Sequence, residues 1–303
     1  RALAPLDLMI ATWKGFSGAR MSYKRIDQLL KDFPKNKEYM ELPAPKGFIS
    51  VEGVYAKPPA SSIYTLENLT FTINKGDVVG IIGPSAAGKS TLARVILGVW
   101  PVQIGTVRID GADISQWDRE HLGKYIGYLP QDIELFAGTI SENIARFNEV
   151  DSQKVIEAAM KARVHEMILR LPEGYDTVIG SGAVVLSGGQ RQRIGLARAI
   201  YDNPVFVVLD EPNSNLDEQG ELALLKTVEE LKQSGTTVVI ITHRPNILKV
   251  TNKILIMNSG KIERYASTEE ILGAVAKQNQ SAQTPQRPAQ IAPQQINLTK
   301  PGS

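Results

Sequence analysis

The stretch Gly83-Pro84-Ser85-Ala86-Ala87-Gly88-Lys89-Ser90-Thr91 constrains what this chain can fold into more than any other segment. It has the pattern G-x-x-x-x-G-K-S, in which the glycines let backbone N–H groups converge on phosphate oxygens. Lys89 adds a positive charge for the outer phosphates, and the hydroxyl of Ser90 is a ligand for Mg²⁺. The loop therefore predicts a site for a nucleotide and its magnesium ion.

The flanks of this loop have the strand and the helix that it needs. An apolar run at 78–82 is typical of a buried strand, and apolar residues then recur at helical spacing (Leu92, Val95, Ile96 and Val99). Bound phosphate would lie at the helix N-terminus, where the helix dipole favours an anion. In this context a chance turn is a much weaker interpretation than a phosphate-binding loop.

Strand and helix patterns alternate along the rest of the chain. Apolar runs indicate strands at 48–51, 69–73, 106–109, 205–209 and 238–241, and helical patterns cover 141–170 and 219–233. The runs at 205–209 and 238–241 are typical of strands buried on both faces of a sheet. This order predicts an α/β fold with a mostly parallel sheet.

Composition excludes several kinds of site. The chain has 303 residues, of which 43% are hydrophobic and 22% charged, as expected of a globular protein with a core. A formal net charge of +2 makes no electrostatic case for nucleic acid. The sequence has no cysteine, which excludes disulfides and thiolate metal sites. No apolar run approaches the roughly 18 to 20 residues of a membrane helix.

The two ends of the chain differ from the segment between them. At 1–33 an apolar stripe at helical spacing is interleaved with basic residues. It fits either an amphipathic helix packed on the domain or the cytoplasmic end of a membrane helix. Prolines punctuate a linker at 34–47. Residues 277–303 are rich in Gln and Pro and have too little apolar surface to offset the entropy of ordering, so we expect a disordered tail.

The apolar run at 205–209 ends in two carboxylates, Asp210 and Glu211. Ligands of α/β sheets bind at the carboxyl ends of strands. Asp210 is therefore a candidate metal ligand, and Glu211 is a candidate base that polarises the attacking water. A strand followed by an acidic turn would show the same residues, but the phosphate-binding loop favours the catalytic interpretation.

A third motif, Leu186-Ser187-Gly188-Gly189-Gln190, precedes a helical pattern. Ser187 and Gln190 have the spacing of a capping box, which is a structural role. A serine-capped helix N-terminus that exposes glycine is also a second phosphate site, separate in sequence from the first. Two such sites suggest a nucleotide that is held between two copies of the chain.

Together these motifs resemble the nucleotide-binding domain of ATP-binding cassette (ABC) transporters over 48–276. The resemblance rests on the phosphate-binding loop, the signature Leu186–Gln190, the pair Asp210-Glu211, and the positions of Gln131 and His243. It implies a P-loop NTPase core, an antiparallel β subdomain and an inserted α-helical subdomain at about 132–190. It also implies ATP and Mg²⁺ as ligands.

The resemblance assigns roles to residues that are ambiguous alone. Gln131 resembles the Q-loop glutamine, which contacts Mg²⁺ and links to the membrane domain, but alone it could be a surface residue. His243 resembles the switch histidine at the γ-phosphate, but alone it could cap a strand end. Asp217 falls in a segment like the D-loop of the dimer interface. For the aromatic residue that stacks on adenine, Tyr55 is the first candidate and Tyr64 the second, and either could instead be strand packing.

A narrower resemblance is to the type I secretion ATPases of alkaline-protease exporters. It rests on 128–144, on Ala86-Ala87, on 211–217, and on Ala4-Pro5 with the nearby 13–16. In those proteins the cassette follows six membrane helices, so we interpret this chain, which starts at Arg1 rather than Met, as a fragment. The resemblance implies a homodimer, a transmembrane domain of the same exporter, a periplasmic adaptor, an outer-membrane channel and an unfolded protein substrate. It places the chain at the cytoplasmic face of the bacterial inner membrane.

We therefore expect an ATPase that powers protein export, with Glu211, His243 and Gln131 as its catalytic residues. The alternative is a soluble ABC ATPase that acts on nucleic acid or ribosomes. Such proteins usually carry long coiled coils or two cassettes, and this sequence has neither pattern. An unrelated P-loop kinase or GTPase is disfavoured by the signature Leu186–Gln190.

Overall fold

The computed structural model describes residues 4–32, 42–59, 61–180 and 186–274. The predicted tail at 277–303 and most of the predicted linker therefore lie outside the described residues. The chain divides into two units: residues 1–43 together with 116–118, and the remainder. Each unit is described by itself.

The first unit contains α1 (Ala4–Asp32), which confirms the helix expected near the N-terminus. The stripe of large apolar side chains described on this helix is exposed, with exposed fractions from 50% for Leu29 to 71% for Tyr23. The rings of Trp13 and Phe16 lie 5.9 Å apart on this stripe. Among the helices that the structure describes, none has the length and apolar character needed to cross a membrane.

The second unit is built on a six-stranded sheet with the order β12-β11-β3-β10-β9-β6. All neighbours are parallel except the β11–β12 hairpin, which confirms the predicted mostly parallel sheet. The interior strands β9 and β10 are buried along their whole length, as their apolar sequences predict. The strands are β3 (Val78–Ile82), β6 (Ile126–Leu129), β9 (Phe206–Asp210), β10 (Thr237–Ile241), β11 (Lys253–Asn258) and β12 (Lys261–Ser267).

A second sheet is antiparallel and has the order β2-β1-β4-β5, which confirms the expected β subdomain. Its strands are β1 (Ile49–Ala56), β2 (Leu66–Ile73), β4 (Ile104–Ile109) and β5 (Ala112–Asp113). The unit begins before β1, because the carboxylate of Asp110 accepts hydrogen bonds from the N–H groups of Lys46, Gly47 and Phe48. The last residues of the predicted linker are thereby attached to the domain.

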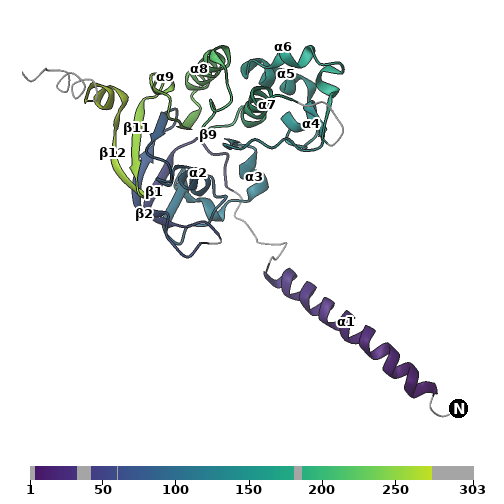
Figure 1. Ribbon diagram of the computed structural model, residues 1–303. Helices are drawn as coiled ribbons and strands as arrows, with labels where there is room; N and C mark the ends of the chain where they lie inside the picture. The colour runs from purple at the N-terminus through teal and green to yellow at the C-terminus, as the bar shows by residue number, and fades with distance from the viewer. Residues whose placement is uncertain (1–3, 33–41, 60, 181–185, 275–303) are drawn as a thin grey trace, which may run out of the picture. The chain divides into compact units, whose positions relative to one another are not determined.

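The helices of this unit lie between strands along the chain. Figure 1 shows that α4, α5, α6 and α7 lie together at one end of the unit. Their starts are set by capping residues, including Thr139 before α4, Asp151 before α5 and Asp217 before α8. The helices are α2 (Lys89–Ile96), α3 (Arg119–Gly123), α4 (Ile140–Ile144), α5 (Ser152–Lys161), α6 (His165–Leu169), α7 (Gly188–Ile200), α8 (Glu218–Gln233) and α9 (Pro245–Leu248). The short elements are 3₁₀ turns at Ile114–Gln116 and Gly174–Asp176 and the strand pair β7 (Gly138–Thr139) and β8 (Val178–Ile179).

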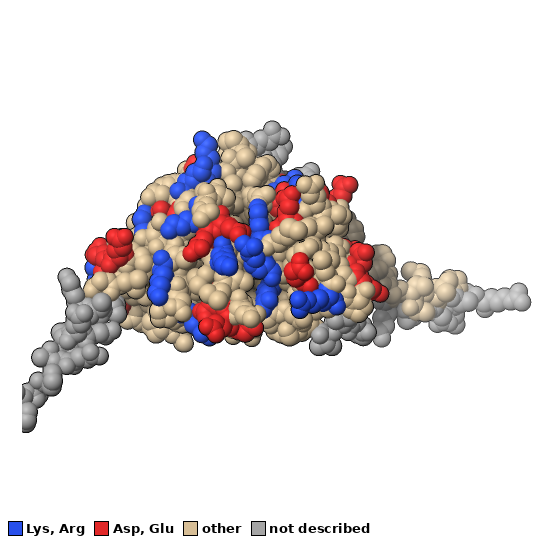
Figure 2. Space-filling view, turned by 90° about the horizontal axis from the view of Figure 1, so that it is seen from above, with Lys and Arg blue, Asp and Glu red and all other residues tan. Residues whose placement is uncertain are grey.

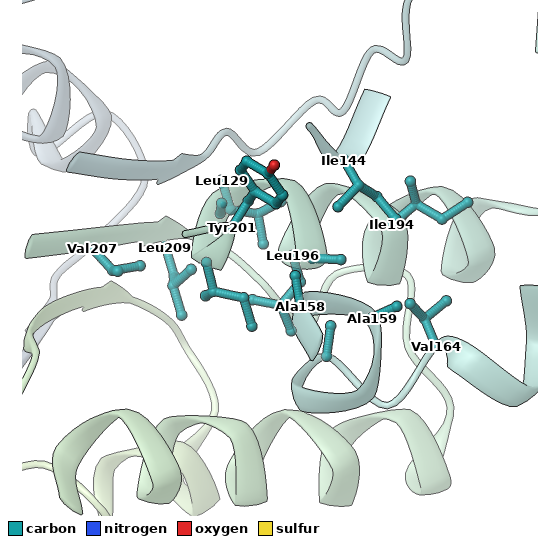
Figure 3. Close-up of a cluster of buried hydrophobic side chains, with 14 of the residues drawn as sticks. Leu129, Ile144, Ala158, Ala159, Val164, Ile194, Leu196, Tyr201, Val207 and Leu209 are labelled. Atoms are coloured by element: carbon teal, nitrogen blue, oxygen red, sulfur yellow. The ribbon is translucent and has the colours of Figure 1, made fainter. Parts of the chain in front are cut away.

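One hydrophobic cluster joins the helical subdomain to the sheet (Figure 3). Ile144 of α4, Val164 before α6 and Ile194 of α7 are fully buried in it. Val207 and Leu209 of β9 belong to the same cluster. Because interiors are close-packed, α7 and the strand that ends at Asp210 are packed as one body.

The side chain of Arg146 adds hydrogen bonds between the helical subdomain and the sheet. The guanidinium of Arg146, after α4, donates hydrogen bonds to the carbonyl oxygens of Gly123 (2.7 Å), Ile126 (3.0 Å), Arg198 (3.0 Å) and Ala199 (3.0 Å). Burial lowers the pKa of Arg146, and the nearby charge of Arg198 lowers it further. The side chain thus links α4 to the start of β6 and to the end of α7.

Charged side chains of both signs alternate over the face shown in Figure 2. That face therefore presents no continuous basic surface of the kind that tracks a nucleic-acid backbone.

Candidate nucleotide-binding and catalytic site

The loop between β3 and α2 is tightly constrained at its two motif glycines. Gly83 has φ 154° and Gly88 has φ 94°. A Cβ on Gly83 would lie 2.1 Å from the carbonyl oxygen of Met257, and one on Gly88 would lie 2.8 Å from Cδ2 of Leu66. Any side chain would push the loop away from β11 or β2, so the close approach of backbone to phosphate depends on glycine here.

Lys89, the first residue of α2, reaches back over this loop. Its Nζ donates hydrogen bonds to the carbonyl oxygens of Gly83 (2.9 Å) and Pro84 (2.8 Å). Burial lowers the pKa of Lys89, while the negative charges of Glu211 and Asp210 raise it. The ammonium group is therefore held at the loop, in the place where the sequence predicts the outer phosphates.

The turn between β11 and β12 contacts the same loop. The N–H of Gly260 donates a hydrogen bond of 3.1 Å to the carbonyl oxygen of Ala87. Ala86 has φ 62°, a left-handed conformation that costs an L residue roughly 1–2 kcal/mol. The hairpin contact is part of what holds the loop in this strained shape, and sequence patterns gave no sign of it.

Asp210 ends β9 as a buried carboxylate, 1% exposed. No hydrogen-bond partner for either of its oxygens is present among the described residues. Burial raises the pKa of Asp210; the hydroxyl of Ser90 is near enough to lower it, although it does not reach hydrogen-bond geometry. Burying a carboxylate without a partner is costly, so this position fits a cation.

The donor set around Asp210 suits magnesium rather than a transition metal. No group of three His, Cys, Asp or Glu side chains that could hold a metal occurs in the part of the chain that the structure describes. Mg²⁺ is commonly bound by one or two carboxylates together with substrate phosphates and waters. Asp210, the hydroxyl of Ser90 and the amide oxygen of Gln131 could hold it beside a nucleotide.

Glu211 lies where three strand ends meet. Its Oε1 is 3.2 Å from Nε2 of His243, which follows β10, and its Oε2 accepts a hydrogen bond of 3.3 Å from Nε2 of Gln131, which follows β6. Glu211 has φ 49°, a left-handed conformation for a residue with a side chain. Its N–H donates to the carbonyl oxygen of Ile241 at 2.9 Å, which anchors this strained residue to β10.

An open cavity of about 450 Å³ brings most of the predicted residues together. It is lined by Thr65, Ser85, Ala86, Ala87, Gly88, Lys89, Ser90, Thr91, Gln131, Glu211 and His243. Thr65 was not predicted as a site residue, because the sequence pattern around it gives no chemical signal. Other predicted site residues do not line it: Gly83, Pro84, Asp210, the signature Ser187–Gln190, Asp217 and Tyr55.

The signature forms the capping box that its spacing predicts. Gln190 N–H donates to Oγ of Ser187 at 3.2 Å, and Ser187 N–H donates to Oε1 of Gln190 at 2.7 Å. Gly188 and Gly189 lie against the segment after β9, because a Cβ on Gly189 would be 3.0 Å from the carbonyl oxygen of Asn215. The start of α7 is thus packed on the predicted D-loop of its own copy.

Two other predicted residues have structural contacts of their own. Asp217 caps α8 by accepting a hydrogen bond of 2.8 Å from the N–H of Gly220, and its carboxylate is 3.3 Å from Arg193. The ring of Tyr55 packs edge-on against Tyr64, with 5.8 Å between the ring centroids. Tyr64 directly precedes Thr65 of the cavity in sequence, but neither tyrosine lines the cavity.

The comparisons with known proteins agree with this geometry. The family model for ABC transporters matches residues 66–214, which include the phosphate-binding loop, the signature and Asp210-Glu211. The chain carries the ATP-binding domain of an ABC transporter. This family assignment implies that the domain binds ATP.

Curated relatives of this ABC domain are ATP-binding proteins of secretion systems. It is 49% identical to the type I secretion system ATP-binding protein PrsD of Rhizobium meliloti, over 92% of this chain and 48% of that protein. It is 35% identical to the cyclolysin secretion/processing ATP-binding protein CyaB of Bordetella pertussis, over 89% of this chain and 38% of the relative. It is 34% identical to the alpha-hemolysin translocation ATP-binding protein HlyB of Escherichia coli O157:H7, over 90% of this chain and 39% of that protein. The chain spans about half or less of each relative's length.

A solved structure of a bacterial Atm1-family ABC exporter with ATP bound has the same fold. The TM-score is 0.80 at 28% identity, covering 92% of this chain and 50% of the exporter chain. The expected ABC ATPase architecture, with its parallel core, antiparallel β subdomain and helical subdomain, is thereby confirmed.

Proposed function

We propose that this ABC domain is the ATP-hydrolysing motor of an exporter that secretes an unfolded protein across the bacterial inner membrane. The observation that carries the proposal is the convergence of Gln131, Glu211 and His243 on one side of the cavity that the phosphate-binding loop lines. Relatives such as PrsD are named as ATP-binding proteins of type I secretion, and these names support an exported protein as the cargo. In this proposal the domain hydrolyses ATP at the cytoplasmic face of the membrane.

In this proposal the backbone of 83–91 cradles the phosphates, and Lys89 neutralises charge on the outer ones. Mg²⁺, held by Ser90, Asp210 and Gln131, supplies charge stabilisation when it is bound. The carboxylate of Glu211 accepts the proton of the attacking water, and His243 at 3.2 Å orients that carboxylate. Phosphoryl transfer needs positioning and charge stabilisation rather than a covalent intermediate, and these side chains supply both.

We further propose that two copies sandwich two ATP molecules. The signature Ser187–Gln190 lies at the N-terminus of α7, where the helix dipole favours an anion, but it does not line the cavity of its own copy. It is therefore available to the ATP of a second copy, with Asp217 near the same interface and Tyr55 or Tyr64 against adenine. The transmembrane domain, periplasmic adaptor and outer-membrane channel are the further partners that this function requires.

A soluble ABC ATPase that acts on nucleic acid or ribosomes remains the second candidate. The net charge of +2 and the mixed charges in Figure 2 favour the exporter over it. The names of the relatives point the same way.

Mixing two inactive variants tests the sandwich. Lys89→Ala damages the phosphate-binding loop, and Ser187→Arg damages the signature. If the signature acts on the other copy's ATP, each mixed dimer has one site with both parts intact, and hydrolysis should return. The release of phosphate from the two variants alone and from their mixture is the measurement.

The control is a mixture of wild-type chain with Lys89→Ala, which retains one intact site in each mixed dimer under either arrangement. An active control with no recovery in the test mixture would mean that the signature acts within its own copy. An inactive control would mean that both sites must be intact together.

A further inference from the structure

Gln192, on the first turns of α7, contacts the segment that follows β9 at three points. Its side chain is buried, 2% exposed. Its Nε2 donates hydrogen bonds to the carbonyl oxygen of Glu211 (3.2 Å) and to Oγ of Ser214 (3.5 Å), and its Oε1 accepts one from the N–H of Asn215 (3.1 Å). The donor and the acceptor of this buried amide therefore both form hydrogen bonds with this segment.

The contact at Glu211 falls on a residue with a left-handed backbone conformation. Glu211 has φ 49°, and its peptide is held by Ile241 on the N–H side and by Gln192 on the carbonyl side. The direction of a side chain follows from its backbone, so the hydrogen bonds of the Glu211 carboxylate to Gln131 and His243 depend on this anchorage. Loss of the Gln192 amide would leave the carbonyl of Glu211 and the N–H of Asn215 without these partners.

The same segment also contacts the signature. A Cβ on Gly188 would lie 3.4 Å from Asn215, and one on Gly189 would lie 3.0 Å from its carbonyl oxygen. Asn215 is thus fixed between the start of α7 and Gln192. A shift of α7 would therefore act on Asn215 through the two glycines and on Glu211 through the hydrogen bond of Gln192, because interiors are close-packed.

We propose that Gln192 is a positioning residue that couples the signature helix to the carboxylate of Glu211. The inference rests on the proposed function, in which the signature binds the ATP of the second copy and Glu211 acts on the ATP of its own. Engagement of one nucleotide by the signature would then set the geometry of the other site through a single side chain. Among the described residues, the side chain of Gln192 bonds to Glu211, Ser214 and Asn215, and none of these is predicted to hold ATP or Mg²⁺.

The first test separates turnover from binding. Gln192→Leu removes the donor and the acceptor while it keeps a side chain of similar size. We expect the affinity for ATP to stay within about twofold and kcat to fall about 10- to 100-fold, because small misplacement of a catalytic group is enough for such losses. Gln153→Leu, which makes the same change on the exposed side of α5, is the matched control and should leave both quantities unchanged.

The second test is a double-mutant cycle with Glu211→Gln. If Gln192 acts through the carboxylate of Glu211, Gln192→Leu should slow the wild-type chain but have little further effect in Glu211→Gln. A purely structural role for Gln192 would slow both backgrounds by the same factor. An equal factor in both backgrounds, or a wild-type kcat in Gln192→Leu, would overturn the proposal.

Gln192→Glu keeps the test decisive if the leucine variant does not fold. It has the same shape and still accepts from Asn215, but an ionised carboxylate cannot donate to the carbonyl of Glu211. Reduced kcat with retained ATP affinity is expected, and wild-type kcat would overturn the inference. A slow Glu211→Gln with a normal Gln192→Glu would overturn this inference alone, whereas wild-type turnover in Glu211→Gln would overturn the catalytic role of Glu211 as well.

Discussion

The imidazole Nε2 of His243 lies 3.2 Å from Oε1 of Glu211, although the two residues follow different strands. The strands β10 and β9 are parallel neighbours, with Ile241 paired to Asp210, so the residues after them meet at one sheet edge. Gln131 reaches the other oxygen of the same carboxylate from β6, the next strand along. Two polar residues from two neighbouring strand ends thus contact the carboxylate of Glu211.

The first prediction concerns this carboxylate. Glu211→Gln keeps the shape and the contact to Gln131 but removes the base, so kcat should fall about 10²- to 10⁴-fold while ATP still binds. The variant should also accumulate as an ATP-bound dimer, because closure remains possible and hydrolysis does not. Steady-state phosphate release and size-exclusion chromatography with ATP measure both effects. Glu166→Gln, exposed on α6, is the control, and equal rates in the two variants would contradict the role of Glu211.

The second prediction concerns the phosphate charge. Lys89→Ala removes the ammonium group that lies against Gly83 and Pro84. A charge-assisted hydrogen bond contributes about 1.5–3 kcal/mol, so the Kd for ATP should rise about 10- to 100-fold. Titration calorimetry measures the affinity, with Lys75→Ala in the exposed turn before β3 as the control. Unchanged affinity in Lys89→Ala would show that the loop does not bind the outer phosphates.

The third prediction concerns the hairpin that contacts the loop. Gly260 has φ 78°, and a Cβ there would lie 2.4 Å from the carbonyl oxygen of Thr65, which lines the cavity. Gly260→Ala should therefore weaken ATP binding as well as lower the melting temperature. Gly235→Ala is a matched control, because Gly235 has φ 77° and nothing within 4 Å of the added Cβ.

Both alanine variants carry the same backbone strain, roughly 1–2 kcal/mol. Only Gly260→Ala adds a clash beside the nucleotide, so only it should change the affinity for ATP. Equal affinities, measured by titration calorimetry, would mean that the turn does not hold the loop in place.

The fourth prediction concerns stability. Arg146→Met removes the guanidinium that donates to four carbonyl oxygens and leaves some of them unpaired. Because unpaired buried groups each cost about 1–3 kcal/mol, the free energy of unfolding should fall by at least about 3 kcal/mol. Arg163→Met removes a surface ion pair with Glu230, which is worth about 0–1 kcal/mol. Denaturant unfolding measures the free energy of unfolding of both variants. Equal losses would show that the hydrogen bonds of Arg146 do not stabilise the fold more than a surface ion pair does.

Local sequence determined the parts of the site that lie within one segment. The glycines and Lys89 of the phosphate-binding loop, the capping box of Ser187 and Gln190, and the buried strand before Asp210 all appear where the pattern predicts them. Each is decided by interactions over a few residues: φ angles that only glycine adopts easily, a side chain that pairs with the third N–H of a helix, and an apolar run long enough for one strand.

Only the tertiary structure decided which of these parts meet. Gln131 and Glu211 are 80 positions apart in the chain, and the order β10-β9-β6 brings them to one edge. Gln192 and Gly260 carried no chemical signal, because an amide in a helix and a glycine in a turn are common; their roles come from what they touch across the fold. The ring of Tyr55 likewise contacts that of Tyr64, and its stacking on adenine stays a prediction. Residue type and spacing specify local conformation, whereas contacts between distant segments depend on strand order and packing, which periodicity does not encode.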